Sequence, residues 1–206
     1  QKLKQEGASK MSILVNNRTK VVVQGLSGSQ GKFHAHKMKE YGTNIVAGVV
    51  PGRGGSEVDG TPVFATVEEA IRKAGANASI IYVPPAYAAD AIIESVDANL
   101  DLCVCITEGI PVKDMIQVKR LMKTVPSRTM LIGPNCPGVI TPGECKLGIM
   151  PGEIHTHGTV GIISNSGMVT YKDVKQFSAF GYGQSTCFVI VASTLVGCKY
   201  MSMLYV

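Results

Sequence analysis

The sequence predicts an α/β fold in which a parallel, doubly wound sheet forms a Rossmann-like domain and the first part of a second α/β domain follows. Strand-like and helix-like segments alternate from residue 21 to residue 132. A glycine-rich turn joins the first of these strands to the first helix. The chain is 45% hydrophobic and 17% charged with 23 glycines. This composition is typical of an α/β protein rich in glycine turns and excludes a disordered chain.

The first strand, turn and helix predict a site for an anion. Val21–Val23 is a short apolar run typical of a buried strand, and it leads into Gly25–Gly31 (GLSGSQG). A helical pattern follows from Lys32 to Tyr41. Bare backbone in such a turn lets N–H groups point at a phosphate, and the helix dipole adds partial positive charge. We therefore expect a phosphate group at this turn.

The next strand distinguishes between possible cofactors. Asn44–Val50 reads as a strand and ends in Pro51–Gly55, which contains Arg53. An NAD-binding unit carries an acidic residue here to hold the ribose hydroxyls. An arginine favours a further phosphate instead, so the pattern indicates NADP or coenzyme A rather than NAD.

The remaining elements of the first domain alternate in the same way. Thr66 is expected to cap a helix at its N-terminus. Helices are expected at Val67–Ala74, Ala86–Ala98 and Val112–Thr124, and strands at Pro62–Phe64, Ser79–Val83, Leu102–Ile106 and Thr129–Ile132. Cys103 and Cys105 share one face of a strand and are expected to be small buried residues.

The domain organisation follows from where this alternation stops. Residues 11–133 form the first predicted domain, and the glycine- and proline-rich residues 134–158 are expected to be a linker or crossing loop. Residues 159–206 read as an incomplete second unit, with strands at Thr159–Ser164 and Ser185–Val191 around a helix at Thr170–Phe180. Residues 1–10 are polar and read as a disordered lead or the remnant of a transit peptide.

Bulk properties exclude several classes of function. The net charge of +5 is mild and the basic residues are scattered, which argues against nucleic-acid binding. No apolar run approaches the roughly 20 residues of a membrane helix. The six cysteines contain no C-x-x-C pair and the four histidines have no metal-ligand spacing, so we expect free thiols, a reducing compartment and no metal site.

Ligands of open α/β sheets bind at the carboxyl ends of the strands. The segments at that edge are Gly25–Gly31, Pro51–Gly55, Thr107–Pro111 and Gly133–Gly138, and Pro84 with Pro85 is expected to form a wall. Cys136 lies between prolines and is either a reactive thiol or an inert turn residue. Ser164–Gly167 follows a strand and opens a helix, so it forms a second possible anion cradle.

Several motifs together closely resemble the α subunit of succinyl-CoA synthetase (succinate–CoA ligase). They are Gly25–Gly31, Ile106–Pro111 (ITEGIP), Ile132–Lys146 (IGPNCPGVITPGECK) and Gly183–Cys187 (GQSTC), and the likeness runs from about Met11 to Cys187. The resemblance implies a CoA-binding Rossmann domain followed by a flavodoxin-like domain. It also implies a β-subunit partner, in a heterodimer or dimer of heterodimers, that holds the nucleotide and Mg²⁺.

The resemblance also implies a reaction. Succinyl-CoA and phosphate give succinyl phosphate and CoA, a histidine of the α subunit takes the phosphoryl group as succinate leaves, and ADP or GDP then receives the phosphoryl group. The implied CoA contacts are Ser27, Gly28, Ser29, Gln30, Arg53 (where the family usually has lysine), Ile106, Thr107, Glu108, Asn135 and Cys136, the last two near the thiol. The implied phosphate and substrate contacts are Ser164, Ser166, Gly167 and Tyr171.

The sequence departs from this family after Phe188, before the segment that holds the phosphorylated histidine. None of His34, His36, His155 and His157 stands at that place, so we expect a chain, truncated or altered at its end, that binds CoA but has no catalytic histidine. Two other functions stay open: a regulatory module that binds CoA or a nucleotide without catalysis, and an NADP-dependent oxidoreductase. The expected location is the matrix of a mitochondrion or similar organelle, with bacterial cytoplasm as the alternative.

Overall fold

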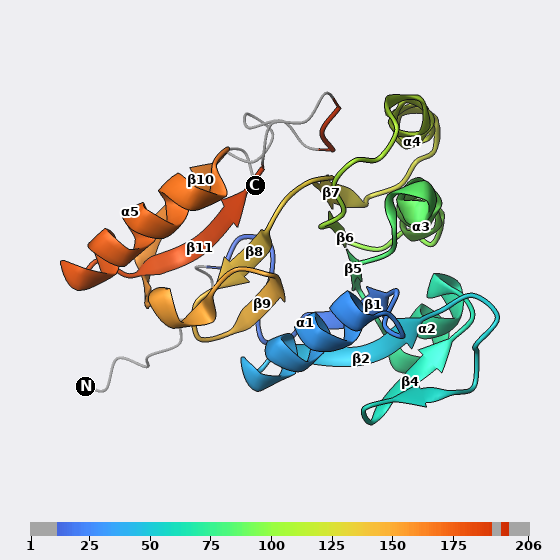
Figure 1. The fold of residues 1–206 in the computed structure, drawn as a ribbon, viewed down its shortest axis with the longest axis horizontal. Helices are drawn as coiled ribbons and strands as arrows, with labels where there is room; N and C mark the ends of the chain where they lie inside the picture. The colour runs from blue at the N-terminus through green and yellow to red at the C-terminus, as the bar shows by residue number, and fades with distance from the viewer. Residues whose placement is uncertain (1–11, 191–194, 198–206) are drawn as a thin grey trace, which may run out of the picture.

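The computed structural model describes residues 12–190 and 195–197. It shows two sheets and five α-helices in this part of the chain (Figure 1). The larger sheet has seven strands in the order β3-β4-β2-β1-β5-β6-β7. Its strands are β1 (Lys20–Gln24), β2 (Asn44–Val49), β3 (Glu57–Val58), β4 (Thr61–Phe64), β5 (Ala78–Ile81), β6 (Leu102–Cys105) and β7 (Met130–Ile132).

The strand order confirms the predicted doubly wound sheet. Every neighbouring pair is parallel except β3 and β4, which form a small antiparallel hairpin at the edge that the sequence patterns did not indicate. The chain places β2 on one side of β1 and then returns to place β5 on the other side. A crevice opens where the order reverses in this way, beyond the carboxyl end of β1.

The strands of this sheet bury alternate side chains in cores on its two faces, as a period of two requires. Val21 and Val23 belong to one apolar cluster, whereas Val22 belongs to another. Cys103 and Cys105 are both fully buried and pack in the same cluster, as predicted. The parallel strands read as continuous apolar runs because both faces are covered.

The first four helices lie within three residues of their predicted bounds, and two of them begin earlier than predicted. They are α1 (Ser29–Glu40), α2 (Val67–Ala74), α3 (Pro85–Asp97) and α4 (Val112–Thr124). Thr66 caps α2, because its side-chain oxygen accepts a 3.2 Å hydrogen bond from the backbone N–H of Glu69. Helix α1 begins three residues earlier than predicted, because its first turn, Ser29–Gly31, carries no apolar side chain that would signal helical periodicity.

The prediction of a linker or crossing loop over residues 134–158 is wrong. The segment contains strands β8 (Gly138–Thr141) and β9 (Cys145–Gly148) and the 3₁₀ turn η1 (Gly152–Ile154). Both strands are short and buried at every residue, so they show no alternation of polar and apolar positions. A Cβ on Gly138 would overlap the backbone of Leu147, so glycine lets the two strands approach closely.

These strands belong to the second, four-stranded sheet, whose order is β10-β11-β8-β9. Strand β10 (His157–Ser164) pairs in parallel with β11 (Gln184–Val189), which pairs antiparallel with β8. Helix α5 (Gly167–Ala179) connects β10 to β11. One apolar cluster joins α1 and the first sheet to Val139, Leu147 and Phe188 of the second sheet. Because the two sheets share this core, the predicted domain boundaries stay a prediction.

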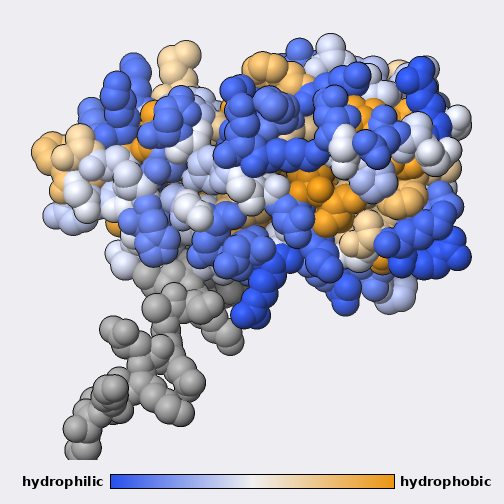
Figure 2. Space-filling model, turned by 90° about the horizontal axis from the view of Figure 1, so that it is seen from below, coloured by the Kyte–Doolittle hydropathy of each residue, from blue (hydrophilic) through white to orange (hydrophobic). Residues whose placement is uncertain are grey.

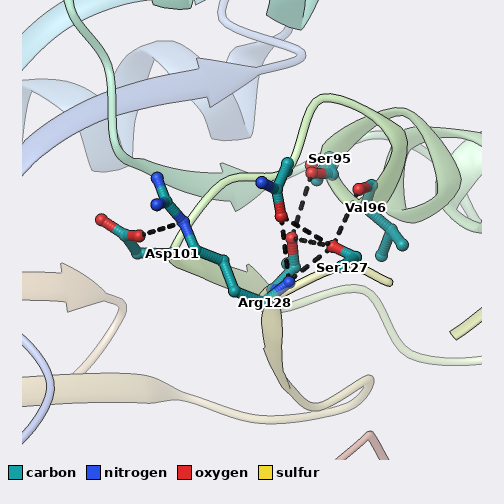
Figure 3. A network of polar contacts seen from close by, with 7 residues as sticks. Ser95, Val96, Asp101, Ser127 and Arg128 are labelled. Carbon is teal, nitrogen blue, oxygen red and sulfur yellow. Dashed lines mark hydrogen bonds and ion pairs between the residues drawn. The ribbon is translucent and has the colours of Figure 1, made fainter. Parts of the chain in front are cut away.

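A polar network fixes the amino-terminal edge of the first sheet (Figure 3). Ser127 donates a 2.9 Å hydrogen bond to the carbonyl of Val96, and the N–H of Arg128 donates to the side chain of Asn99 at 2.9 Å. Arg128 also pairs with Asp101 at 2.7 Å, but both side chains are exposed, so this pair contributes little to stability. The network lies at the edge opposite the glycine turn and therefore serves the fold.

None of the helices in the described ranges is both long and apolar enough to cross a membrane.

Candidate functional site

The glycine turn packs tightly beneath the start of α1. Gly25 has a φ of 84°, and its N–H donates a 3.0 Å hydrogen bond to the carbonyl of Val49 at the end of β2. A Cβ on Gly31 would overlap the carbonyl oxygen of Gly25, so the helix approaches the turn as closely as glycine allows. Gly28 is the N-cap residue, and no described side chain caps the helix. The first-turn N–H groups are therefore available to an anion.

A cleft with two cations lies beside this turn. It has a volume of about 260 Å³ and is lined by Ser27, Lys32 and Arg53 together with residues of the β3–β4 hairpin, one of which is the acidic Glu57. The two cations outnumber this one acid. A backbone hydrogen bond stabilises the loop that carries Arg53: the N–H of Arg53 donates to the carbonyl of Val50 at 3.0 Å. Arg53 thus lies near Ser27, as predicted. Lys32 was missed, although its place directly after the glycine turn was a usable signal.

A larger, mostly apolar cleft of about 400 Å³ is lined by residues from the ends of β1 and β2, the loop after β5 and helix α3. Pro84 forms part of its wall, as predicted, whereas Pro85, which was predicted with it, does not line this cleft. Its lining residues are Gln24, Val49, Pro51, Val83, Pro84, Tyr87, Asp90, Ala91 and Glu94. Burial raises the pKa of the Glu94 carboxyl above its ordinary value. An apolar cleft with a few polar groups at its rim is typical of a site for a flat organic ring.

Hydrophobic surface also gathers on this half of the molecule. Figure 2 shows a face that is mostly hydrophilic, with the hydrophobic residues concentrated in its right half, where the first sheet and its helices lie (Figures 1 and 2).

A third cleft, of about 250 Å³, joins four of the predicted residues: Gln30, Ile106, Thr107 and Glu108. Thr107 donates a 2.7 Å hydrogen bond from its hydroxyl to the carbonyl of Val83, and this bond ties the loop after β6 to the loop after β5. The structure adds His34, Tyr82 and Ile149 to the lining. Sequence reasoning missed these three because they come from a helix face, a strand end and the second sheet.

Asn135 and Cys136 do not line any of these three clefts. Cys136 is only 4% exposed, and its sulfur lies 3.3 Å from the carbonyl oxygen of Cys105. Burial raises the pKa of the Cys136 thiol well above its ordinary value. A buried, protonated thiol is a poor nucleophile, so the structure favours the inert turn residue over the reactive thiol.

The second predicted cradle forms at the start of α5. Ser164 ends β10, Ser166 is the N-cap and Gly167 is the first helical residue. The N–H of Ser166 donates to the hydroxyl oxygen of Ser164 at 3.2 Å. Tyr171 lies one turn into the helix, and burial raises the pKa of its phenol. The helix begins at Gly167 and not at Thr170, so the cradle lies directly at its start.

Comparisons with known proteins agree with this geometry. A family model described as a CoA-binding domain matches residues 16–109, which include the glycine turn, Arg53 and the loop after β6. The chain is 60% identical over 176 residues to the succinate–CoA ligase [ADP-forming] subunit alpha of Aquifex aeolicus, a stretch that covers 85% of this chain. It is 52% identical over 194 residues to the same subunit of Staphylococcus epidermidis, a stretch that covers 94% of this chain.

The chain spans 58% and 64% of the length of these two relatives. Among solved structures, ATP citrate lyase from Methanothrix soehngenii in complex with citrate and coenzyme A has a TM-score of 0.76 at 19% identity, covering 95% of this chain and 35% of that one. PH0766 from Pyrococcus horikoshii has a TM-score of 0.73 at 19% identity, covering 92% and 43%. The structural likenesses support the fold, and the sequence identities show that this chain belongs to the family of succinate–CoA ligase α subunits.

Proposed function

We propose that this chain binds coenzyme A at the carboxyl edge of its first sheet, as the CoA-binding part of a succinate–CoA ligase α subunit. The observation that carries the proposal is the set of three clefts of different chemistry around one glycine turn. Coenzyme A has three chemically different parts: a base, a group of phosphates and a long neutral arm that ends in a thiol.

Each part of the ligand matches one surface. The adenine fits the apolar cleft, where the carboxyl groups of Asp90 and Glu94 can accept hydrogen bonds from its amino group. The phosphates fit the N-terminus of α1 and the cleft with Lys32 and Arg53. The arm fits the third cleft, which has no lysine or arginine in its lining.

The proposal also includes the reaction of the full-length protein to which this chain corresponds. The relatives' names support the reversible conversion of succinyl-CoA, phosphate and ADP to succinate, CoA and ATP. In that reaction Ser164, Ser166 and Gly167 would hold a phosphate at the start of α5, and Tyr171 would contact the substrate. A β-subunit partner would supply the nucleotide and Mg²⁺ site. The relatives are bacterial, which favours the bacterial cytoplasm over the organelle matrix.

Calorimetric titration with CoA, dephospho-CoA and NADP tests the proposed ligand. We expect CoA to bind and NADP to give no saturable heat. In this proposal Arg53 binds the 3′-phosphate, the group that dephospho-CoA lacks. Arg53→Ala should therefore weaken CoA binding about fivefold to tenfold, the effect of losing about one charge-assisted hydrogen bond at a solvated site, and should leave the affinity for dephospho-CoA nearly unchanged.

Arg53→Lys is the matched control, because it keeps the charge and should retain most of the affinity for CoA. Saturable binding of NADP together with no heat from CoA would contradict the proposal and favour the oxidoreductase.

A further inference from the structure

His34 and Tyr82 form a stacked pair of rings in the third cleft. Their ring centroids lie 5.4 Å apart and their planes differ by 10°. Phe33 packs its ring edge-on against the imidazole at 5.0 Å and 80°. His34 comes from α1, and Tyr82 directly follows β5 at the carboxyl edge of the sheet. The two neighbouring rings therefore restrain the plane of the imidazole within the cleft.

Tyr82 presents its ring to the cleft and not its hydroxyl. The hydroxyl oxygen is buried and has no hydrogen-bond partner among the described residues. Burial also raises the pKa of the phenol far above its ordinary value. The imidazole is thus the member of the pair whose polar atoms can meet a ligand in the cleft.

The imidazole is suited to a neutral partner. Burial and the nearby charge of Lys146 lower the pKa of His34, so the ring is mostly uncharged near neutral pH. A neutral imidazole offers one N–H donor and one nitrogen acceptor. Glu108 also lines the cleft, and no lysine or arginine among the described lining residues offsets its charge, so a phosphate is disfavoured there. The cleft therefore suits a neutral ligand segment that donates and accepts hydrogen bonds, such as a chain of amide groups.

The position of His34 along α1 indicates which part of the ligand passes it. Gln30 and His34 are four residues apart, so they lie on the same face of the helix, one turn from each other. A ligand whose diphosphate sits at the helix start and whose arm enters the third cleft crosses Gln30 first and His34 next. We propose that His34 hydrogen-bonds the pantetheine arm of bound CoA and is a specificity-determining residue for that arm; this inference rests on the proposed function.

The test compares CoA with adenosine 3′,5′-bisphosphate, which carries the base and phosphates but no arm. His34→Phe keeps a stacking ring and removes both ring nitrogens. We expect this variant to bind CoA about fivefold to tenfold more weakly, the cost of about one hydrogen bond, and to bind the bisphosphate with unchanged affinity. His36→Phe is the matched control on the same helix, because His36 is exposed and pairs with Glu40 instead of lining the cleft.

The outcomes separate this inference from the proposed function. If the wild-type chain binds CoA and His34→Phe binds it equally well, or loses CoA and the bisphosphate by the same factor, the inference is overturned while the proposed function stands. If the wild-type chain binds no CoA, the proposed function fails and the inference fails with it.

A measurement on the unmodified chain covers the case of a variant that does not fold. The NMR signal of the His34 ring should shift on saturation with CoA and stay in place on saturation with the bisphosphate. An unchanged ring signal in saturating CoA overturns the inference.

Discussion

At the scale of single residues, the buried side chain of Gln24 connects the elements that line the apolar cleft. Gln24 is buried at the end of β1, and its amide nitrogen lies 2.8 Å from the hydroxyl of Ser79, 3.0 Å from the carbonyl of Ala91 and 2.8 Å from the hydroxyl of Ser95. Two N–H hydrogens shared among three acceptors tie β1 to β5 and α3. The backbone around the apolar cleft is thereby held in place.

Gly31 gives a prediction at this scale. Gly31→Ala places a Cβ against the carbonyl oxygen of Gly25, and the backbone there has little room to move. We expect a loss of about 1–3 kcal/mol in the free energy of unfolding, measured by urea denaturation, together with weaker CoA binding.

Gly161→Ala is the control for this change, because the nearest atom to its Cβ would be the Ser185 hydroxyl at 3.9 Å, an ordinary contact. Equal stability of the two variants would contradict the tight approach of α1 to the turn.

At the scale of elements, the helix ends show which signals are local. Helix α2 begins after Thr66 and is closed by Gly75, whose φ is 69°. Each of these two residues caps its end of the helix through hydrogen bonds to residues no more than five positions away in the chain. Its first N–H, on Val67, is instead satisfied by Glu94 of α3 at 2.8 Å. The cap from α3 is a tertiary contact that no local pattern in α2 reveals.

Glu94 gives a prediction for pH dependence. Burial raises its pKa above the ordinary 4.5, although the hydrogen bond from Val67 opposes the shift. The folded state then holds the proton more tightly than the unfolded state, so the chain loses stability as the pH rises through the interval above 4.5. Glu94→Gln keeps an acceptor for Val67 and removes the buried charge.

We expect Glu94→Gln to have the higher melting temperature at about pH 7, with the difference disappearing at about pH 4, below the pKa of both states. Thermal unfolding of both proteins across this range measures the effect. A difference that stays constant with pH would show that the carboxyl charge is not its cause.

At the scale of the whole molecule, the two sheets share one core, and buried hydrogen bonds join segments that lie far apart in the chain. Thr43, between α1 and β2, donates a 2.8 Å hydrogen bond to the carbonyl of Lys146 and accepts a 3.0 Å bond from its N–H. Thr141 of β8 donates to the carbonyl of Val15 at 2.6 Å. These contacts join segments more than 100 residues apart in the chain, so only the tertiary fold brings their partners together.

Thr43 gives a prediction for this contact. Thr43→Val preserves the shape of the side chain but leaves the N–H and carbonyl of Lys146 without their buried partner. We expect a loss of about 1–3 kcal/mol in the free energy of unfolding and faster amide exchange at Lys146.

Thr43→Ser keeps the hydroxyl and should retain most of the stability. Identical behaviour of the Val and Ser variants would show that the reciprocal bonds do not stabilise the contact.

Part of the candidate site could be predicted because its signals are local. The glycine turn, Arg53, and the loop Ile106–Glu108 each follow a strand of a parallel sheet, and the carboxyl ends of such strands meet at one edge. His34 and Tyr82 were missed as lining residues because a helix face and a strand end carry no sequence mark of the cleft that they enter. Lys32 was missed although its place directly after the glycine turn was a usable signal.

The sequence by itself determined the doubly wound first sheet, the bounds of α2 and α4, and the place of the glycine turn before α1, because propensity, capping and hydrophobic periodicity act over a few residues. The tertiary structure alone decided that residues 134–158 contain strands β8 and β9, that Cys136 is buried, and that His34 stacks on Tyr82. Pairing and burial of this kind depend on segments far apart in the chain, so their energies appear only when the two sheets pack together.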